Sequence, residues 1–414
     1  MKYLPRALAS TVRRAARTFP AVLVTGARQS GKTTLLRHEF GGTHPYLSLE
    51  RPDVRARALA DPVGFLREHP APLILDEIQY APHLLSFIKD QIDEDRKPGR
   101  WLLTGSQSFP LMRGVSQTLA GRVAVLTLEP LSTEELHGNP RPPDLRGLLG
   151  RVFAEKAESI VPRRARMHDV DLVDWLLRGG YPEPRLHPEV DRQLWFGSYV
   201  QTYLERDIRD LRQVGDLDAF GRFLFLIATR TGNLLNLAEL GREAGVSGPT
   251  AKQWLSVLEA SQIVILVRPY HRNLGKRVRK SPKLYLIDTG LATFLLGLHS
   301  PEAVLQGPSA GALVETAVVS EWLKACRNRG EQPGLYYWRS SAGHEVDLVI
   351  EHDGKLFGLE VKATATPTPH HADGLARWLD LAGRSARGAL ACDVDRPLAL
   401  RPGIRAVPWH LAWV

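Results

Sequence analysis

The stretch of this chain that most constrains its fold is LVTGARQSGKTTLL, residues 23 to 36. A strand-like apolar run enters it, and a helix-like apolar run leaves it. The part between them, residues 26 to 33, matches the pattern G-x-x-x-x-G-K-[ST] in full. Glycines in such a loop allow a tight turn whose backbone N–H groups point at phosphates, and the next helix adds its positive end. The stretch therefore predicts a strand, a phosphate-binding loop (P-loop) and a helix in succession.

This loop predicts a site for ATP. The residues that we expect around the phosphates are Gly26, Ala27, Arg28, Gln29, Ser30, Gly31, Lys32, Thr33 and Thr34. Lys32 is expected to reach the β- and γ-phosphates, and the hydroxyl of Thr33 to ligate Mg²⁺. The alternative, an ordinary glycine-rich turn, does not explain why a strand and a helix flank the loop.

A second motif supports this site. In PLILDEIQ, residues 72 to 79, four apolar residues end at Asp76 and Glu77. A buried strand with paired carboxylates at its carboxyl end is the Walker B arrangement. Asp76 is expected to hold Mg²⁺, partly through water, and Glu77 to orient or deprotonate the attacking water. Without the P-loop, the same pair would indicate a solvated turn.

Two further stretches offer groups that could act on the γ-phosphate. RWLLTGSQ, residues 100 to 107, is a strand that ends in Thr104, Ser106 and Gln107, any of which could contact the phosphate or the water; we name Ser106 among the catalytic candidates. Arg122 precedes the apolar run VAVLTL. It could sense nucleotide in its own subunit or serve as an arginine finger on a neighbour. A surface arginine before a strand is the alternative.

Short apolar runs alternate with helical stretches from residue 21 to about residue 135, which predicts the buried parallel strands of an α/β sheet. Residues 138–150, GNPRPPDLRGLLG, are rich in glycine and proline and indicate a boundary. The following residues are predicted to be largely helical up to about residue 230. A helix-turn-helix pattern comes next, and the chain ends in a helix and several strands.

The order of the motifs ARQSGKTTLL, LILDEIQ, LLTGSQ and LAGRV…LEPLS resembles the prokaryotic AAA+-like ATPases whose C-terminal half is a domain of unknown function. GGYPEP at 179–184, YLERDI at 203–208 and GALVET…EVDLVI…LEVKA extend the resemblance over nearly the whole chain. It implies an α/β fold with four parts. These are an AAA+-like ATPase core at 1–137, a helical region at 138–230, a winged-helix-like module at 231–300 and a nuclease-like domain at 301–414.

The middle of the chain has a pattern suited to DNA. In residues 236–264, Ser247 is placed to cap a second helix with Trp254, Leu255 and Leu258 on its buried face and Lys252 facing outward. A basic stretch follows, containing Arg268, Arg272, Lys276, Arg277, Arg279, Lys280 and Lys283. A β-hairpin wing with this charge suits a phosphate backbone. Winged helices that dock proteins are the alternative.

The C-terminal part contains a possible metal site. Asp347 lies near the start of one predicted strand, and Glu360 and Lys362 lie two apart, hence on one face, of the next. Glu315 in the preceding helix is a fourth candidate. These residues resemble the PD-(D/E)xK nuclease core, in which carboxylates bind Mg²⁺ and a lysine assists the attack of water. The fold also serves for binding or assembly, so cleavage and scaffolding both remain open.

Net charge, hydropathy and cysteine content indicate the partners and the cellular compartment of the protein. A net charge of +9 favours polyanionic partners, and no apolar run is long enough for a membrane span. Two distant cysteines and the lack of a secretory signal favour the cytoplasm. YLERDI includes Arg206, either part of a solvated, salt-bridged helix or an interface arginine.

Together these features predict a cytoplasmic, Mg²⁺-dependent ATPase that moves or remodels duplex or branched DNA. We expect a homo-oligomer; the most specific version of this prediction is a hexameric ring that drives branch migration. One alternative is an ATP-gated nuclease. The other is an ATP-dependent switch that docks a protein partner and has no need of DNA.

Overall fold

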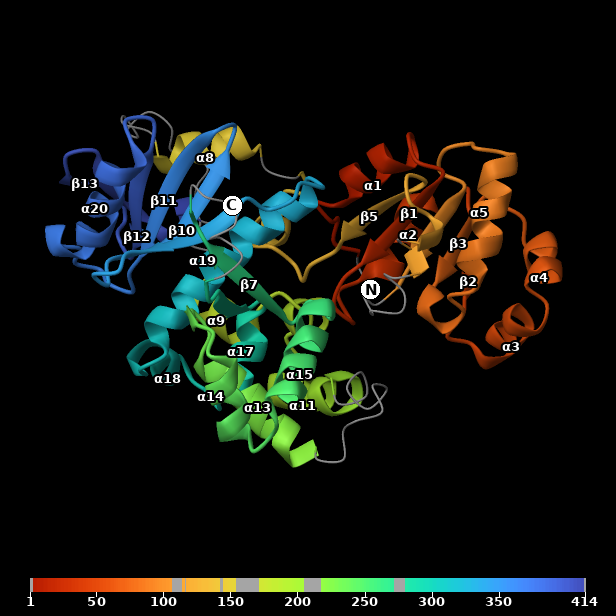
Figure 1. Cartoon of the computed structure of the whole chain (residues 1–414), viewed down its shortest axis with the longest axis horizontal. Helices are drawn as coiled ribbons and strands as arrows, with labels where there is room; N and C mark the ends of the chain where they lie inside the picture. The colour runs from red at the N-terminus through yellow and green to blue at the C-terminus, as the bar shows by residue number, and fades with distance from the viewer. Residues whose placement is uncertain are drawn as a thin grey trace. The chain divides into compact units, whose positions relative to one another are not determined.

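The computed structural model describes residues 3–105, 114–115, 117–141, 144–153, 171–204, 217–271 and 280–412. The chain forms two compact units (Figure 1). The first comprises residues 1–142 with the short segments 260–262 and 327–331, and the second comprises 143–259, 263–326 and 332–414. None of the described helices is long and apolar enough to cross a membrane.

The first unit is built on a five-stranded parallel sheet in the order β2-β3-β4-β1-β5. Its strands are β1 (Ala21–Thr25), β2 (Tyr46–Ser48), β3 (Leu73–Asp76), β4 (Trp101–Thr104) and β5 (Val123–Thr127). The structure thus confirms the parallel α/β sheet predicted from the apolar runs. Because all strands point the same way, their carboxyl ends meet at one edge, where α/β sheets bind ligands.

Helices cover both faces of this sheet. They are α1 (Ala9–Ala16), α2 (Lys32–Phe40), α3 (Pro52–Ala60), α4 (Pro62–Glu68) and α5 (Leu84–Glu94), with a 3₁₀ turn η1 (Ile78–Tyr80) and the short α7 (Thr133–Leu136). In β1, Leu23 packs in the core formed with α4 and α5, whereas Val22 and Val24 pack in the core formed with α1 and α2. Since both faces are buried, the strand is apolar throughout rather than alternating.

The second unit contains a nine-stranded mixed sheet in the order β13-β14-β12-β11-β10-β9-β7-β8-β6. The strands are β6 (Asn233–Leu234), β7 (Val264–Pro269), β8 (Lys283–Leu286), β9 (Leu335–Arg339), β10 (Glu345–His352), β11 (Lys355–Val361), β12 (Arg387–Cys392), β13 (Leu398–Arg401) and β14 (Ile404–Pro408). β10 and β11 form the expected hairpin, with Asp353 and Gly354 at positive φ in its turn.

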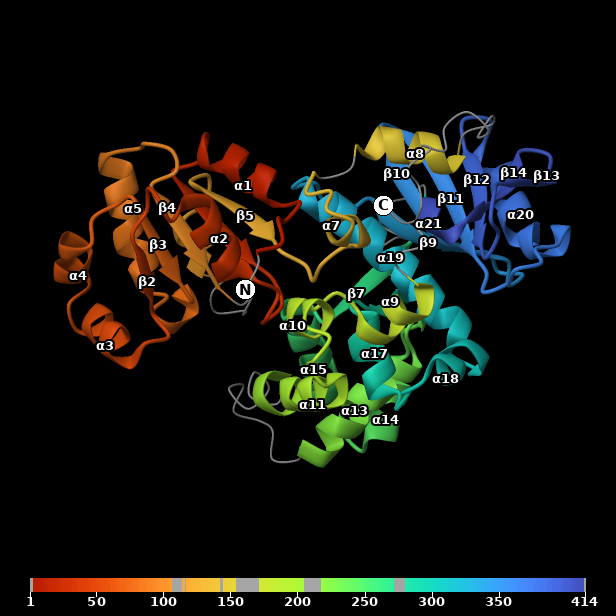
Figure 2. The ribbon, with the colours of Figure 1, turned by 180° about the vertical axis from the view of Figure 1, so that it is seen from behind.

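The helices of this unit gather in two places (Figure 2). Their bounds are α8 (Leu145–Phe153), α9 (Leu172–Arg178), α10 (Pro182–Leu186), α11 (Arg192–Tyr199), the π-helical turn η4 (Val200–Leu204), α13 (Leu217–Thr229), α14 (Leu237–Ala244), α15 (Gly248–Ala260), α17 (Thr289–Leu295), α18 (Pro301–Gln306), α19 (Ala310–Asn328), η5 (Pro369–Ala372), α20 (Asp373–Ala382) and α21 (Trp409–Ala412). α17 packs against α9, α11 and α13, while α20 packs on β10, β11 and β12.

The two units differ from the four predicted parts, whose boundaries stay predictions. The predicted boundary at 137/138 is close to the division at 142/143. The predicted boundaries at 230 and 300 both fall inside the second unit. The reason is that β7 pairs in parallel with β9, which joins the strands around the helix-turn-helix to the C-terminal sheet.

The GGYPEP motif has a structural role. Gly179 has φ +63°, and a Cβ added there would lie 2.2 Å from a carboxylate oxygen of Asp288. The same carboxylate accepts a hydrogen bond from the amide of Gly180 (2.7 Å) and caps α17 through the amide of Leu291 (2.9 Å). Burial raises the pKa of Asp288. The motif thus fixes the turn after α9 against the start of α17.

Candidate functional site

The P-loop connects β1 to α2, as the sequence predicts. Gly26 has φ +138°, and a Cβ at this position would lie 2.1 Å from the carbonyl oxygen of Leu128. Gly31 has φ +94° and directly precedes the first residue of α2, Lys32. Gln29 also has positive φ (62°). The loop therefore needs its glycines, and it ends at a helix N-terminus, which is a favourable place for phosphates.

Lys32 lies folded against its own loop. Its side chain is buried, and Nζ donates to the carbonyl oxygens of Gly26 (3.2 Å) and Ala27 (2.9 Å). A phosphate oxygen would be a stronger acceptor for this ammonium because a charge-assisted hydrogen bond is shorter and stronger than a neutral one. Lys32 is thus held at the position from which it can turn to a triphosphate.

Three hydroxyl groups converge on Asp76 at the end of β3. Thr33 Oγ1 donates to Oδ1 (2.6 Å), Thr104 Oγ1 donates to the same oxygen (2.5 Å), and Tyr46 OH donates to Oδ2 (2.9 Å). Asp76 is only 4% exposed. Burial, followed by the negative charge of Asp76, raises the pKa of Tyr46 to about 12. The structure thus brings together Thr33 and Asp76, the two residues expected at the magnesium ion, and their oxygens suit that ion.

Glu77 follows Asp76 in a left-handed conformation, with φ 59° and ψ 50°. This conformation is uncommon for residues other than glycine. Two hydrogen bonds hold it: the amide of Glu77 donates to Thr104 Oγ1 (3.0 Å), and Gln79 Nε2 donates to the carboxylate. Thr104 therefore contacts both acidic residues. Among the three candidates in its segment, Ser106 and Gln107 lie outside the described residues.

Arg122 lies away from this site. It is at the amino end of β5, where its carbonyl oxygen accepts from the amide of Ala21 (3.2 Å), whereas the P-loop follows the carboxyl end of β1. Its guanidinium pairs with Asp93 of α5 (2.6 and 3.0 Å), and hydrogen bonds from Arg122 and Lys89 lower the pKa of Asp93 to about 2. The structure does not bring Arg122 to the P-loop of its own chain. An arginine finger on a neighbour stays a prediction.

Arg6 is a contributor that the sequence did not reveal. It is 5% exposed and donates to the carbonyl oxygens of Ser30 in the P-loop (2.7 Å) and Glu129 (2.7 Å), and it pairs with Glu135 (3.0 Å). Glu135 also closes a capping box with Ser132 at the start of α7. The pattern S-T-E-E could have predicted the capping box. No local pattern links it to Arg6.

The predicted helix-turn-helix region contains α14 and α15. The amide of Thr250 donates to Ser247 Oγ (3.2 Å) at the start of α15, and Trp254, Leu255 and Leu258 are buried. Lys252 and Lys280 are exposed. Arg272, Lys276, Arg277 and Arg279 lie outside the described residues, as does Arg206.

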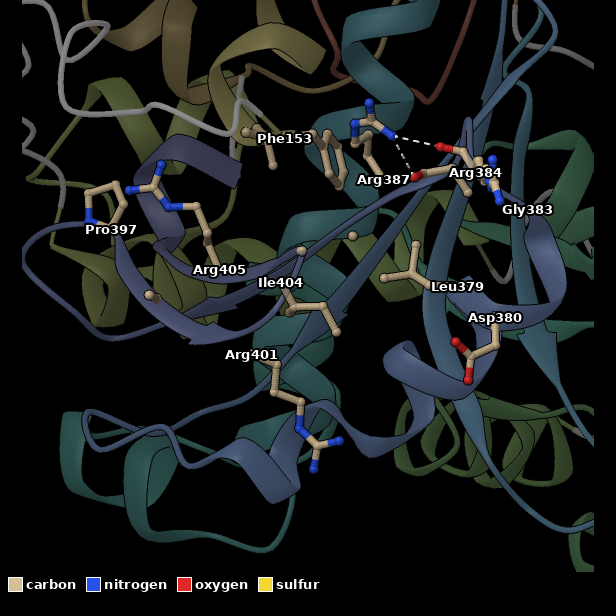
Figure 3. Close-up of a pocket in the computed structure, with 15 residues that line it drawn as sticks. Phe153, Leu379, Asp380, Gly383, Arg384, Arg387, Pro397, Arg401, Ile404 and Arg405 are labelled. Atoms are coloured by element: carbon tan, nitrogen blue, oxygen red, sulfur yellow. Dashed lines mark hydrogen bonds between the residues drawn. The ribbon is translucent and has the colours of Figure 1, made fainter.

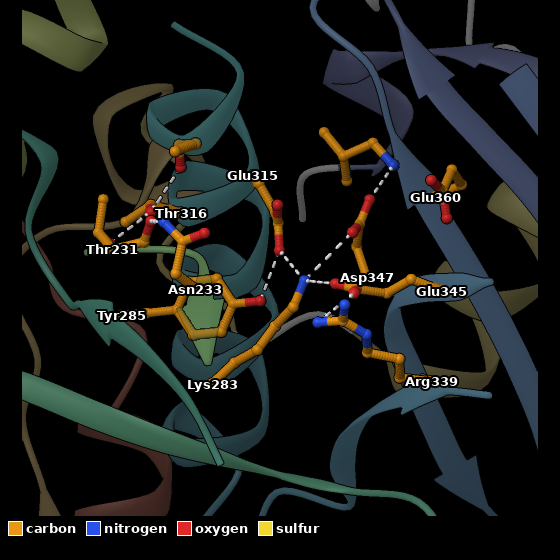
Figure 4. A network of polar contacts seen from close by, with 12 residues as sticks. Thr231, Asn233, Lys283, Tyr285, Glu315, Thr316, Arg339, Glu345, Asp347 and Glu360 are labelled. Atoms are coloured by element: carbon orange, nitrogen blue, oxygen red, sulfur yellow. Dashed lines mark hydrogen bonds and ion pairs between the residues drawn. The ribbon is translucent and has the colours of Figure 1, made fainter. Parts of the chain in front are cut away.

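Lys283 differs from the expectation for the basic stretch. It is only 3% exposed, so it cannot contact a phosphate backbone. Its ammonium lies instead among carboxylates of the C-terminal half (Figure 4), with Glu315 at 2.9 Å, Asp347 at 3.3 Å and Glu345 also in contact. Burial alone would lower the pKa of Lys283, but the surrounding groups, Tyr285 first and then Glu315, Asp347 and Glu345, raise it.

The expected metal ligands do not share one centre. Glu315 and Asp347 point at Lys283, whereas Glu360 pairs with Lys362 (2.6 Å). Burial, followed by the charge of Asp347, raises the pKa of Glu315 to about 7 and also raises that of Glu360. Among the described residues, no three histidine, cysteine or acidic side chains are arranged to hold a metal ion. As they lie, these residues do not fit a divalent cation.

A cavity of about 840 Å³ opens between α8, α20 and the strands β12 to β14 (Figure 3). Four arginines line it: Arg384, Arg387, Arg401 and Arg405. Arg401 already donates to the carbonyl oxygen of Pro369 (2.7 Å) and pairs with Asp373. Its lining joins Val152 and Phe153 of α8 to a stretch much later in the chain, residues 379–405, and no local sequence pattern links the two.

Three parts of the chain match known domain families. Residues 18–137 match the AAA domain, residues 169–302 a domain of unknown function (DUF8612), and residues 310–412 another domain of unknown function (DUF4143). Uncharacterized proteins of Mycobacterium bovis and Mycobacterium tuberculosis are each 33% identical over 364 residues, which cover 88% of this chain and 75% of each relative. The chain belongs to their family. This AAA-domain family is the one that the order of motifs resembles, with a P-loop ATPase domain followed by a C-terminal domain of unknown function.

A solved structure also resembles this member of the AAA-domain family. It is a Walker-type ATPase of Pyrococcus abyssi, 14% identical, and the match covers 71% of this chain and 99% of that chain with a TM-score of 0.42. A similarity this low carries no argument about function.

Proposed function

We propose that this protein is a Mg²⁺-dependent ATPase that uses ATP to move or remodel DNA. The observation that carries the ATPase part is the convergence of Thr33 and Thr104 on Asp76, with Glu77 held beside them by Thr104. This arrangement supports Thr33 and Asp76 as the pair that binds the metal, Glu77 as the general base and Thr104 as the group that positions both acidic residues.

In the proposed reaction, each of these residues has one task. Lys32 leaves the carbonyl oxygens of Gly26 and Ala27 and pairs with the β- and γ-phosphates. Thr33 and Asp76 would hold Mg²⁺, and the bound ion would neutralise phosphate charge. Glu77 accepts a proton from the attacking water. Thr104 keeps Glu77 in its left-handed conformation and thereby aims the carboxylate.

DNA as the cargo is supported by the order of elements in the second unit. α13, β6, α14, α15, β7 and β8 follow one another, with β8 between β7 and β6 in an antiparallel sheet. This is the order of a winged helix, in which α15 would be the recognition helix. The exposed Lys252 lies on α15, and the exposed Lys280 lies in the connection between β7 and β8. In the proposed complex, both lysines would contact phosphates.

Assembly into a homo-oligomer belongs to the same proposal, and a hexameric ring is its most specific version.

The test of the proposed function is ATP turnover by the purified protein without DNA and then with single-stranded, duplex and four-way junction DNA. We expect turnover to require Mg²⁺ and to rise with at least one DNA form. Turnover that no DNA changes, by a protein that binds none of them, would favour a switch that docks a protein partner.

A further inference from the structure

A cluster of carboxylates in the second unit already has a cation among its members (Figure 4). Nζ of Lys283 lies 2.9 Å from Glu315 Oε1 and 3.3 Å from Asp347 Oδ1, and it also contacts Glu345. An ammonium has three N–H donors, and here three carboxylates surround it. Lys283 therefore occupies the space between Glu315 and Asp347 that a shared metal ion would need.

Lys283 is fixed in this position by its strand. β8 lies between β7 and β6, and Lys283 pairs with Val267 on one side and Leu234 on the other. The side chain is only 3% exposed. Removing it from the carboxylates without bulk solvation would leave a buried charge unpaired, which is strongly unfavourable.

Two of the carboxylates also accept hydrogen bonds from groups other than Lys283. Asp347 Oδ2 accepts from the amide of Val361 (2.9 Å), and Glu315 Oε1 accepts from Tyr285 OH (2.6 Å) in addition to Lys283. A magnesium ion requires oxygen ligands at about 2.0–2.1 Å in a near-octahedral arrangement. It would have to enter beside a positive ammonium, which repels it at short range in a poorly screened site.

The lysine of the nuclease-like motif is also paired. Lys362 Nζ donates to Glu360 Oε1 (2.6 Å), and the second oxygen of Glu360 is buried with no hydrogen-bond partner. Glu360 and Lys362 therefore form a pair beside the cluster around Lys283 rather than part of one metal centre.

We propose that Lys283 is the resident cation of this nuclease-like domain and closes its carboxylate cluster to divalent metal. The domain then holds its partner without cutting it. This deepens the proposed function, in which DNA is moved rather than cleaved, but it does not depend on ATP hydrolysis.

The test is Mn²⁺ binding by the full-length protein without nucleotide, measured from the electron paramagnetic resonance signal of free Mn²⁺. Any ions bound by the ATPase unit are common to all variants and cancel in the comparison. We expect the wild-type protein and Asp347→Asn to bind the same number of ions. Lys283→Met keeps an apolar stem and removes the charge, so it should bind one more ion. Lys283→Met/Asp347→Asn should lose that ion again, and Lys283→Arg should gain none.

Two outcomes would overturn the proposal. One is a wild-type protein that loses a bound Mn²⁺ on Asp347→Asn. The other is a folded Lys283→Met protein, checked by circular dichroism, that gains no ion. The comparison of the wild-type protein with Asp347→Asn leaves Lys283 unchanged, so it tests the proposal even when Lys283→Met does not fold. ATP turnover measured on the same preparations tests the ATPase proposal separately.

Discussion

The hydroxyl of Thr104 donates a 2.5 Å hydrogen bond to Asp76 and accepts a 3.0 Å hydrogen bond from the amide of Glu77. One side chain at the end of β4 therefore positions both acidic residues at the end of β3. The strands are neighbours in the sheet, and Leu75 pairs with Leu103 directly before the two ends. The pairing of β3 with β4 therefore sets the position of Thr104 relative to Asp76 and Glu77.

Thr104→Val removes the hydroxyl at nearly constant volume. A hydrogen bond to a charged group contributes roughly 1.5–3 kcal/mol. We therefore expect the turnover number to fall about tenfold or more, since each 1.4 kcal/mol corresponds to a factor of ten. ATP affinity should change little because Lys32 and the loop amides are untouched. Thr104→Ser is the matched control and should retain most activity. Equal turnover in Thr104→Val and the wild-type protein, measured by phosphate release, would refute this role.

Lys32→Ala and Glu77→Gln should fail at different steps. Lys32→Ala removes the cation that pairs with the phosphates, so we expect weaker nucleotide binding. Glu77→Gln leaves Thr33 and Asp76 intact but removes the base, so we expect normal ATP binding with turnover reduced by about 10²-fold or more. Binding is measured by fluorescence of a labelled nucleotide. Wild-type hydrolysis by Glu77→Gln would contradict the Walker B assignment.

Gly179→Ala should destabilise the second unit. Gly179 has φ 63° and ψ −154°, a region that is essentially restricted to glycine, and the new Cβ would lie 2.2 Å from Asp288. We expect a loss of about 2–3 kcal/mol in the free energy of unfolding, measured by denaturant titration. Gly354→Ala is the control, because Gly354 also has positive φ but a Cβ there meets nothing within 4 Å. Equal losses in both variants would show that contact with Asp288 contributes nothing.

The wing should contribute to DNA affinity through charge. Neutralising Arg277, Arg279 and Lys280 together should weaken binding to unrelated sequences about equally and reduce the salt dependence of binding, because fewer counterions are released. Fluorescence anisotropy at several salt concentrations measures both effects. Unchanged affinity in the triple variant would remove the wing from the interface.

The P-loop and Walker B assignments followed from the sequence because their geometry is local. Gly26, Lys32 and Thr33 lie in one turn, and a strand ending in Asp76 must present it at the same edge of a parallel sheet. Arg122 shows the limit of this reasoning. It precedes its strand, so it lies at the opposite edge, a consequence of parallel topology that its nearness to an apolar run does not reveal.

Lys283 shows a second limit. In a list of basic residues it resembles its neighbours, yet it begins β8, with Tyr285 two positions later on the same face. The alternation K-L-Y-L puts two leucines on the opposite face and so predicts an exposed lysine, but all four residues of β8 are buried, including Lys283. Its partners Glu315 and Asp347 are 32 and 64 residues away, so no local pattern predicted the cluster. The same holds for Arg6, which contacts Glu135 across 129 residues.

The last prediction is that ATP is used to move DNA rather than to cut it. The ATPase site has its acidic, hydroxyl and lysine groups together, whereas the nuclease-like motif has Lys283 where its metal would lie. We expect the purified protein to rearrange a forked or four-way junction substrate in an ATP-dependent manner, without efficient cleavage of linear duplex. Lys32→Ala should block the rearrangement, and Glu360→Gln should largely keep it, because Glu360 is not among the residues expected at the nucleotide. Gel electrophoresis separates the rearranged strands from cleavage fragments. Fragments that require Mg²⁺ and vanish in Glu360→Gln, with no ATP-driven rearrangement of any substrate, would instead make the protein an ATP-gated nuclease.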